Sequence, residues 1–447
     1  MPNAEATSRR IPSQNPPSAH VGTAVDEAIP NVLAAPPRPS TARMRHISGE
    51  TVEREVGMIT RNLAPLAAVV AVTLLAAACG GDDGEMTAPS SPPATEAPAE
   101  PSAPEPPPAT EAPAVPPETT AAAEETVALS QAGGRLAEVR ARGSVRCGVR
   151  DALPGFSFLT PDGEHEGFDA DFCRVIAAAV LGDASAVDFV NVQTADRFTA
   201  LQSGEIDVLV RNVTFTASRD GKEASNFVYT TLYDGQGVMV PASSGIRGLE
   251  DLADANICVA QGTTTELNLT DVMRSRGIPF NPVTFGEATE ARVGYTAGQC
   301  EAMTSDKSAL AVFKFEIGRE GGEEQFILPE TISKEPLGPV VLDGDTEWAQ
   351  VVQWAVMATI QAWEFGLDSG NIASATGTNP ALARFLGEEG FDPGLGLPSD
   401  FAVQVVAQVG NYEEIYRRHL EPLGLPLNGS VNDLWTNGGL LYVPPYR

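Results

Sequence analysis

Short apolar runs alternate with amphipathic segments along the chain from about residue 132 onward. This alternation predicts an α/β fold, in which helices cover both faces of a sheet. The pattern occurs in two successive series, one before Pro241 and one after it, and each series predicts a doubly wound lobe. The runs that predict strands are 144–149, 187–192, 206–210, 257–260, 283–285 and 302–304. The segments that predict helices are 168–181, 195–202, 266–276, 288–298, one near Leu249, one from Ser308 and more around Trp348, Trp354 and Trp363.

A separate apolar run, at residues 63–78, precedes both series. It is 16 residues long, follows Arg61 and ends in three alanines before Cys79. This order is typical of a secretion signal, and the run is shorter than the roughly 20 residues that span a bilayer as a helix. Its end resembles the lipobox of bacterial lipoproteins, although Ala76 stands where that motif prefers Leu. We predict a lipoprotein signal peptide at 58–79 with lipidation at Cys79; an ordinary signal peptide is the alternative.

The regions on either side of this signal are not predicted to fold. Residues 1–57 precede a normal signal start at Met58, so we interpret them as disordered or as the result of a misassigned start codon. Residues 80–131 are rich in Pro, Ala, Glu and Thr and bury too little apolar surface to fold. They predict a disordered tether between the lobes and a lipid anchor on the outer face of the cell membrane.

Length and charge narrow the choice of fold and partner. A chain of 447 residues exceeds one ordinary core, which agrees with two lobes. The formal net charge is -30, and residues 80–130 contain ten acidic residues and no Lys or Arg. This balance argues against a nucleic-acid partner, because phosphate binding requires clustered Lys and Arg.

Four cysteines remain once Cys79 is assigned to lipid, an even number that suits an oxidising compartment. Pairing Cys147 with Cys173, and Cys258 with Cys300, would close one loop inside each lobe. The sequence leaves three pairings open.

Candidate chemistry follows the predicted strands, because ligands of open α/β sheets bind beyond the carboxyl ends of strands. The loop after 206–210 contains Arg219, whose guanidinium suits a carboxylate. The loop after 257–260 contains Thr263, three residues before Glu266, a capping spacing that opens a helix toward an anion. The loop after 302–304 contains Asp306, which can accept an ammonium group. Together they suit a zwitterionic α-amino acid, whose two charges must both be paired on desolvation.

Each of these residues also has a purely structural interpretation. An Arg after a strand often forms a structural ion pair, and a Thr or Asp before a helix is often only a cap. Arg211 is a further candidate for a ligand side-chain pocket, with pairing to Asp207 or Asp234 as its alternative. No Ser-His-Asp arrangement and no metal-ligand spacing is apparent, so we predict no metal, no cofactor and no catalytic residue.

Several stretches resemble the general L-amino-acid-binding proteins of polar amino acid ABC transporters, in solute-binding protein family 3. The resemblance covers about residues 143–447. The stretches that carry it are 147–149, 153–157, 198–208, 233–237, 261–269, 332–339, 408–415 and 434–442.

This resemblance implies a periplasmic-binding-protein fold with two hinge crossovers, near 238–241 and 338–341. It divides the folded part into 132–237 (first lobe), 238–339 (second lobe) and 340–447 (return to the first lobe and a C-terminal extension). It implies that an L-amino acid is captured by hinge closure outside the cytoplasm and delivered to an ABC permease. The residues that it assigns to the ligand are Arg219 for the carboxylate, Asp306 for the ammonium, Thr214, Thr263 and Thr264 for polar contacts, Phe156 against the ligand side chain, and Arg211.

Two other functions use the same fold. One is an enzyme resembling arogenate or prephenate dehydratases, which requires a general acid in the cleft. Of the four histidines, at 20, 46, 165 and 419, none lies in the three loops described above. The other is a ligand-sensing partner of a receptor.

Overall fold

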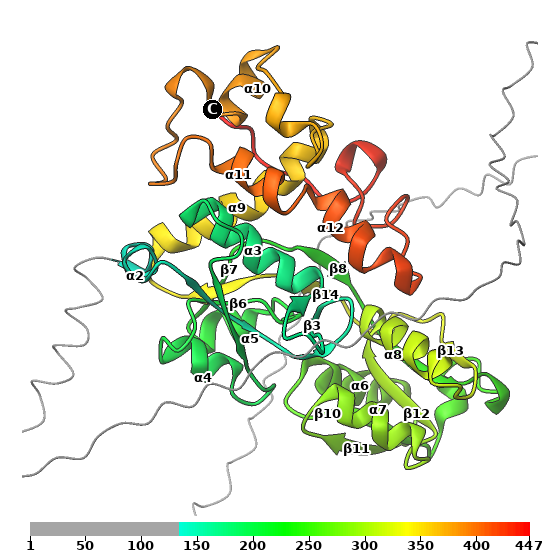
Figure 1. Cartoon of the computed structure of the whole chain (residues 1–447). Helices are drawn as coiled ribbons and strands as arrows, with labels where there is room; N and C mark the ends of the chain where they lie inside the picture. The colour runs from blue at the N-terminus through cyan, green and yellow to red at the C-terminus, as the bar shows by residue number, and fades with distance from the viewer. Residues whose placement is uncertain (1–133) are drawn as a thin grey trace, which may run out of the picture. The chain divides into compact units, whose positions relative to one another are not determined.

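The computed structural model describes residues 134–447 and contains two five-stranded sheets (Figure 1). The first sheet has the order β5-β1-β6-β15-β7 and the second has the order β11-β10-β12-β9-β13. In each sheet three neighbouring strands pair in parallel. One strand, β15 in the first sheet and β9 in the second, pairs antiparallel with the strand on either side of it. The α/β prediction is confirmed, with mixed rather than wholly parallel sheets. The first sheet comprises β1 (Val145–Val149), β5 (Val187–Asn191), β6 (Val208–Leu209), β7 (Ser225–Phe227) and β15 (Val340–Leu342). The second comprises β9 (Gln236–Pro241), β10 (Asn256–Ala260), β11 (Asn281–Phe285), β12 (Ala302–Asp306) and β13 (Gln325–Ile327).

Helices follow the strands, as the alternating pattern predicts. We call each sheet with its helices the first and second lobe. The first lobe has α2 (Gly134–Arg142), α3 (Phe168–Leu181), α4 (Arg197–Gln202) and α5 (Ala217–Lys222), with a small sheet of β2 (Ala152–Leu153), β3 (Ser157–Leu159) and β4 (His165–Glu166). The second has α6 (Thr264–Arg276), α7 (Ala288–Thr296) and α8 (Lys307–Arg319). The predicted helix 168–181 is confirmed, because Gly182 takes the left-handed conformation, φ 72°, and ends α3.

The chain crosses between the lobes twice, along a two-stranded ribbon. Strand β8 (Leu232–Asp234) leads into β9, and the antiparallel β14 (Glu335–Leu337) leads into β15. The first crossing therefore lies at Gly235, slightly before the expected 238–241, because β9 already belongs to the second sheet. At the return crossing, a Cβ on Gly338 would lie 1.9 Å from the Tyr229 carbonyl oxygen, so only glycine fits there.

The four cysteines of the lobes lie in two close pairs. The sulfur atoms of Cys147 and Cys173 are 2.08 Å apart, and those of Cys258 and Cys300 are 1.99 Å apart. The first pair joins β1 to α3, and the second joins β10 to the loop just before β12. Of the three pairings open from the sequence, the structure brings together the one that stays within each lobe.

A C-terminal helical extension packs on the first lobe. It consists of α9 (Thr346–Glu364), α10 (Pro380–Phe385), α11 (Phe401–Gln408) and α12 (Tyr412–His419). Trp348 of α9 is 1% exposed, and its indole N–H donates to the Asp207 carbonyl at 2.9 Å. None of the helices between residues 134 and 447 has the length and apolar character needed to cross a membrane.

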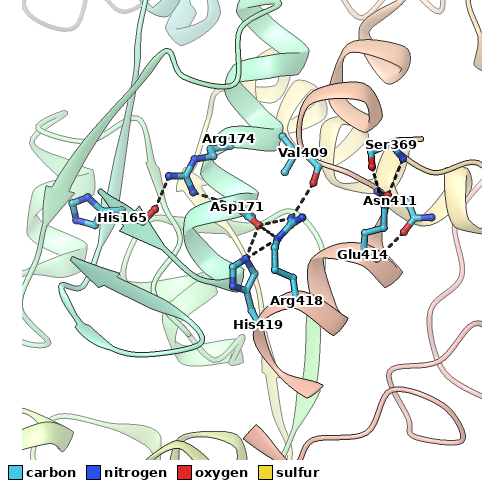
Figure 2. A network of polar contacts seen from close by, with 9 residues as sticks. All are labelled: His165, Asp171, Arg174, Ser369, Val409, Asn411, Glu414, Arg418 and His419. Atoms are coloured by element: carbon cyan, nitrogen blue, oxygen red, sulfur yellow. Dashed lines mark hydrogen bonds and ion pairs between the residues drawn. The ribbon is translucent and has the colours of Figure 1, made fainter. Parts of the chain in front are cut away.

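Asp171 fastens α12 to α3 (Figure 2). Its carboxylate lies 2.7 Å from Nη2 of Arg418 and 2.7 Å from Nε2 of His419, and it also pairs with Arg174 at 3.0 Å. Burial alone would raise the pKa of Asp171, but the hydrogen bonds and charges of His419 and Arg418 hold it below the ordinary value. The interaction is therefore fully present above the unfolded-state pKa and is lost as pH falls through the lowered folded-state pKa.

We expect Asp171→Asn to lower the free energy of unfolding by about 1 to 3 kcal/mol at neutral pH, because the buried side chain loses the charge that accepts from Arg418, His419 and Arg174. The difference from the unmodified protein should shrink as pH falls through the pKa of Asp171, where that protein loses the charge too. Urea unfolding at several pH values measures this, with the exposed Asp162→Asn as the control. Equal loss in both variants, or a pH-independent difference, would contradict the assignment.

Candidate ligand-binding site

In each lobe the strand order reverses between two neighbouring parallel strands, and ligands of such sheets bind at that point. The pairs are β1 and β6 in the first lobe, and β10 and β12 in the second. The loops after these four strands meet around a small cavity of about 40 Å³, which adjoins a wider groove of about 770 Å³. The cavity is lined by Arg150, Thr194, Arg197, Arg211, Asn212, Thr214 and Arg219 of the first lobe, and by Ala260, Thr263, Thr264, Thr265, Ala288, Ser305 and Asp306 of the second.

Arg219 lies in α5, whose start is capped by Thr216. Its Nη1 donates to the Thr214 carbonyl at 2.8 Å, which fixes the guanidinium at the cavity wall. Arg219 is 9% exposed and makes no ion pair among residues 134–447. Burial lowers the pKa of Arg219. A guanidinium held in this way suits an anionic ligand group, and a structural ion pair does not explain it.

Asp306 is the last residue of β12, at the N-cap position of α8, but its side chain caps no N–H of that helix. Its hydrogen bond is a long one, 3.5 Å, from Asn212 Nδ2. Burial raises the pKa of Asp306 well above its ordinary value, and the negative charges of Asp234 and Glu335 raise it further. A cationic group in the cavity would favour the ionised carboxylate. The structural interpretation of this residue as a helix cap is therefore not supported.

The threonines bring hydroxyl groups of both lobes together. Thr263 caps α6 by accepting from the Glu266 N–H at 3.2 Å, whereas the Glu266 carboxylate accepts from Gly262 instead of closing a reciprocal capping box. Thr264 Oγ1 donates to Glu335 at 2.9 Å and lies 3.4 Å from Thr214 Oγ1. All three predicted threonines line the cavity.

Arg211 lines the cavity, but it pairs with neither Asp207 nor Asp234, the two structural partners considered from the sequence. Its Nε donates to the Val192 carbonyl at 2.7 Å, and its Nη2 lies 2.8 Å from the carboxylate of Glu287. Asp207 instead pairs with Arg135 and Arg142.

Phe156 is placed in the core of the first lobe. It is 1% exposed, packs edge-on against Phe168 with ring centroids 6.4 Å apart, and is not part of the cavity wall. The histidines at 165 and 419 pair with Asp151 and Asp171, away from the cavity.

The cavity is also lined by two arginines that were not predicted from the sequence, Arg150 and Arg197. Arg150 directly follows β1, so the same strand-end rule that identified the other loops would have found it. Burial, with the charge of Arg211, lowers the pKa of Arg150 to about 10. Arg197, at the start of α4, carries no such sequence pattern. It is 5% exposed, its Nε has no hydrogen-bond partner among the described residues, and burial together with nearby arginines lowers its pKa.

The cavity thus contains both cationic and anionic groups. Arg150, Arg197, Arg211 and Arg219 form a cluster, since the charges of the other three lower the pKa of Arg197, and Asp306 supplies a carboxylate. No group of three or more His, Cys, Asp or Glu residues in 134–447 is arranged to hold a metal ion. This arrangement complements a zwitterion and can pair a further anionic group.

A two-lobed α/β fold with a charged cavity at the strand ends of both lobes is typical of an extracytoplasmic solute receptor. The chain belongs to the bacterial extracellular solute-binding proteins, family 3, whose model matches residues 145–368. The general L-amino acid-binding periplasmic protein AapJ of Rhizobium johnstonii is 44% identical over 320 residues, 70% of this chain and 92% of that protein. The glutamate/glutamine/aspartate/asparagine-binding protein BztA of Rhodobacter capsulatus is 41% identical over 326 residues, 72% of this chain and 96% of that protein.

A solved structure agrees with these sequence matches. It is an ABC transporter periplasmic binding protein from Brucella ovis with glutathione bound, 40% identical, with a TM-score of 0.66. It covers 70% of this chain and 99% of its own. The family and the fold that the sequence resemblance implied are confirmed.

Proposed function

We propose that this protein is the substrate-binding component of an ABC importer for polar L-amino acids, which it captures by closure of the two lobes. The observation that carries the proposal is that one cavity is lined both by a fixed guanidinium, Arg219, which has no ion-pair partner among the described residues, and by a buried carboxylate, Asp306. The names of the relatives AapJ and BztA support an amino-acid ligand. Closure is driven by the higher affinity of the closed form for the ligand.

Each polar residue of the cavity has a role in this proposal. Arg219 binds the α-carboxylate, Asp306 binds the α-ammonium, and Thr214, Thr263 and Thr264 supply hydroxyl and N–H contacts. Arg211 belongs to the side-chain pocket, together with Arg150 and Arg197. Because these three guanidinium groups lie close to one another in the cavity wall, acidic and amide side chains suit the pocket best.

Binding without turnover fits better than catalysis. The described cavity contains no histidine, and the relatives AapJ and BztA are named as binding proteins. The dehydratase alternative is therefore not favoured.

The receptor acts outside the cytoplasm, in keeping with its family. We propose that lipid on Cys79 holds it to the outer face of the cell membrane and that 80–131 serve as the tether. Both predictions lie outside the described residues and are supported by the sequence pattern. Intact mass of the mature protein from its own cells tests them: an acylated Cys79 at the N-terminus is expected, and retention of 1–57 would contradict them.

Thermal unfolding in the presence of each of the twenty L-amino acids tests the proposed function. A ligand that binds only the folded state raises the unfolding temperature with concentration. We expect the unfolding temperature to rise with glutamate, glutamine, aspartate or asparagine. In a separate assay, incubation with prephenate or arogenate should give no product. The absence of any shift, or formation of product from either acid, would contradict the proposal.

A further inference from the structure

Glu287 belongs to the second lobe, at the N-cap of α7, but its carboxylate contacts the first lobe. Oε2 lies 2.9 Å from Nη2 of Arg150 and 2.8 Å from Nη2 of Arg211. Oε1 accepts from the backbone N–H of Thr194 at 2.6 Å. The Glu287 side chain is only 13% exposed, so water screens these contacts little.

The pairs of Glu287 with Arg150 and Arg211 are the only ion pairs between the two lobes within residues 134–447. The other direct contacts between cavity residues of the two lobes are weaker, such as the one between Thr214 and Thr264 at 3.4 Å. A contact that forms only when the lobes meet stabilises the closed arrangement over the open one. Glu287 therefore fastens the lobes together, in the sense that its contacts stabilise the closed arrangement over the open one.

The same carboxylate changes the charge of the side-chain pocket. Three guanidinium groups, those of Arg150, Arg197 and Arg211, lie near two carboxylates, Glu287 and Asp169, which leaves one positive charge unbalanced. Arg197 has no carboxylate within ion-pairing distance among the described residues, so the unbalanced charge is assigned to it. A single anionic group on the ligand would complete the balance.

Burial would raise the pKa of Glu287, but the charge of Arg211, the Thr194 N–H and the charge of Arg150 hold it below the ordinary value. The carboxylate is thus ionised at neutral pH, as its role in the charge balance requires.

We propose that Glu287 both fastens the lobes together and determines ligand selectivity, by neutralising part of the arginine cluster so that amide as well as acidic side chains are accepted. This inference rests on the proposed function, since it concerns the side-chain pocket for the same ligand. With Glu287 in place, an amide side chain leaves one buried positive charge unbalanced. Without the charge of Glu287, an amide side chain leaves two buried positive charges unbalanced, and an acidic side chain becomes the better ligand.

The test substitutes Glu287→Gln in the full chain and measures the dissociation constants of glutamate and glutamine by calorimetry. Gln keeps the size of the side chain and an acceptor for Thr194 but removes the charge. We expect the preference for glutamate over glutamine to rise by about tenfold, which corresponds to about 1.4 kcal/mol. The matched control is Glu250→Gln in the same lobe, where an exposed carboxylate pairs with Arg276; its preference should be unchanged.

A purely structural role would weaken both ligands by the same factor and leave the preference unchanged, which would overturn the selectivity role. The fastening role is measured without ligand, by small-angle X-ray scattering. Glu287→Gln should have a larger radius of gyration than Glu250→Gln, and equal radii would overturn that role. If the unmodified protein binds neither glutamate nor glutamine, the proposed acidic and amide ligand class fails, and the scattering result still decides whether Glu287 fastens the lobes.

Discussion

Replacing Arg219 with alanine should weaken binding of the preferred amino acid by about 2 to 5 kcal/mol, because the change strips one partner from a buried ion pair. The guanidinium is positioned by the Thr214 carbonyl at 2.8 Å and has no carboxylate of the described chain to satisfy it. Its free energy of interaction is therefore available to the α-carboxylate of the ligand. Calorimetry on the full chain measures the loss.

Two controls separate this role from general damage. Arg219→Lys keeps the charge but loses the bidentate geometry, so it should bind more weakly than the unmodified protein and better than Arg219→Ala. Arg276→Ala removes a half-exposed arginine of the second lobe and should bind normally. Near-normal affinity of Arg219→Ala would refute its assignment to the ligand carboxylate.

Asp306→Asn should cause a loss of similar size, about 2 to 5 kcal/mol, because the ligand ammonium would lose its charged acceptor. It should also remove a pH dependence. Burial and the charges of Asp234 and Glu335 raise the pKa of Asp306 in the ligand-free protein, so its carboxyl group keeps the proton to a higher pH than an ordinary aspartate does. A bound ammonium lowers this pKa, so binding releases a proton, and affinity falls as pH drops below the raised pKa.

Titrations in two buffers of different ionisation enthalpy measure the released proton directly. The unmodified protein should release protons in the pH range between the bound and free pKa of Asp306, and Asp306→Asn should release fewer. Ser305 lies beside Asp306 in the cavity wall, so Ser305→Ala is a matched control that keeps the carboxylate and should keep the proton release. Unchanged proton release in Asp306→Asn would show that another group binds the ammonium.

The sequence was sufficient where local chemistry decides the structure. Helix α3 begins and ends at the predicted residues because apolar spacing and Gly182 act within the helix itself. The strand-end rule located Arg219 and Asp306, because parallel strands bring their carboxyl ends to the same edge. Strands β7 and β15, which complete the first sheet, were not predicted, because each has only three residues and their pairing joins segments far apart in the chain.

The charge balance of the pocket depends on contacts between the lobes, and local sequence patterns do not predict such contacts. Glu287 lies 137 positions from Arg150 in sequence and reaches it only because the lobes close on each other. Arg197 starts a short helix and no sequence pattern points to a ligand there, so the missing hydrogen-bond partner of its Nε among the described residues emerges only from the packed structure. Phe156, which the resemblance assigned to the ligand, lies in the core of the first lobe and does not line the cavity.

Isothermal titration of the purified protein with the twenty L-amino acids tests most directly whether it is an amino-acid receptor. We predict saturable binding with one site per chain for glutamate, glutamine, aspartate or asparagine, and severe weakening of that binding in Arg219→Ala and Asp306→Asn. Absence of saturable binding by all twenty amino acids would contradict the account.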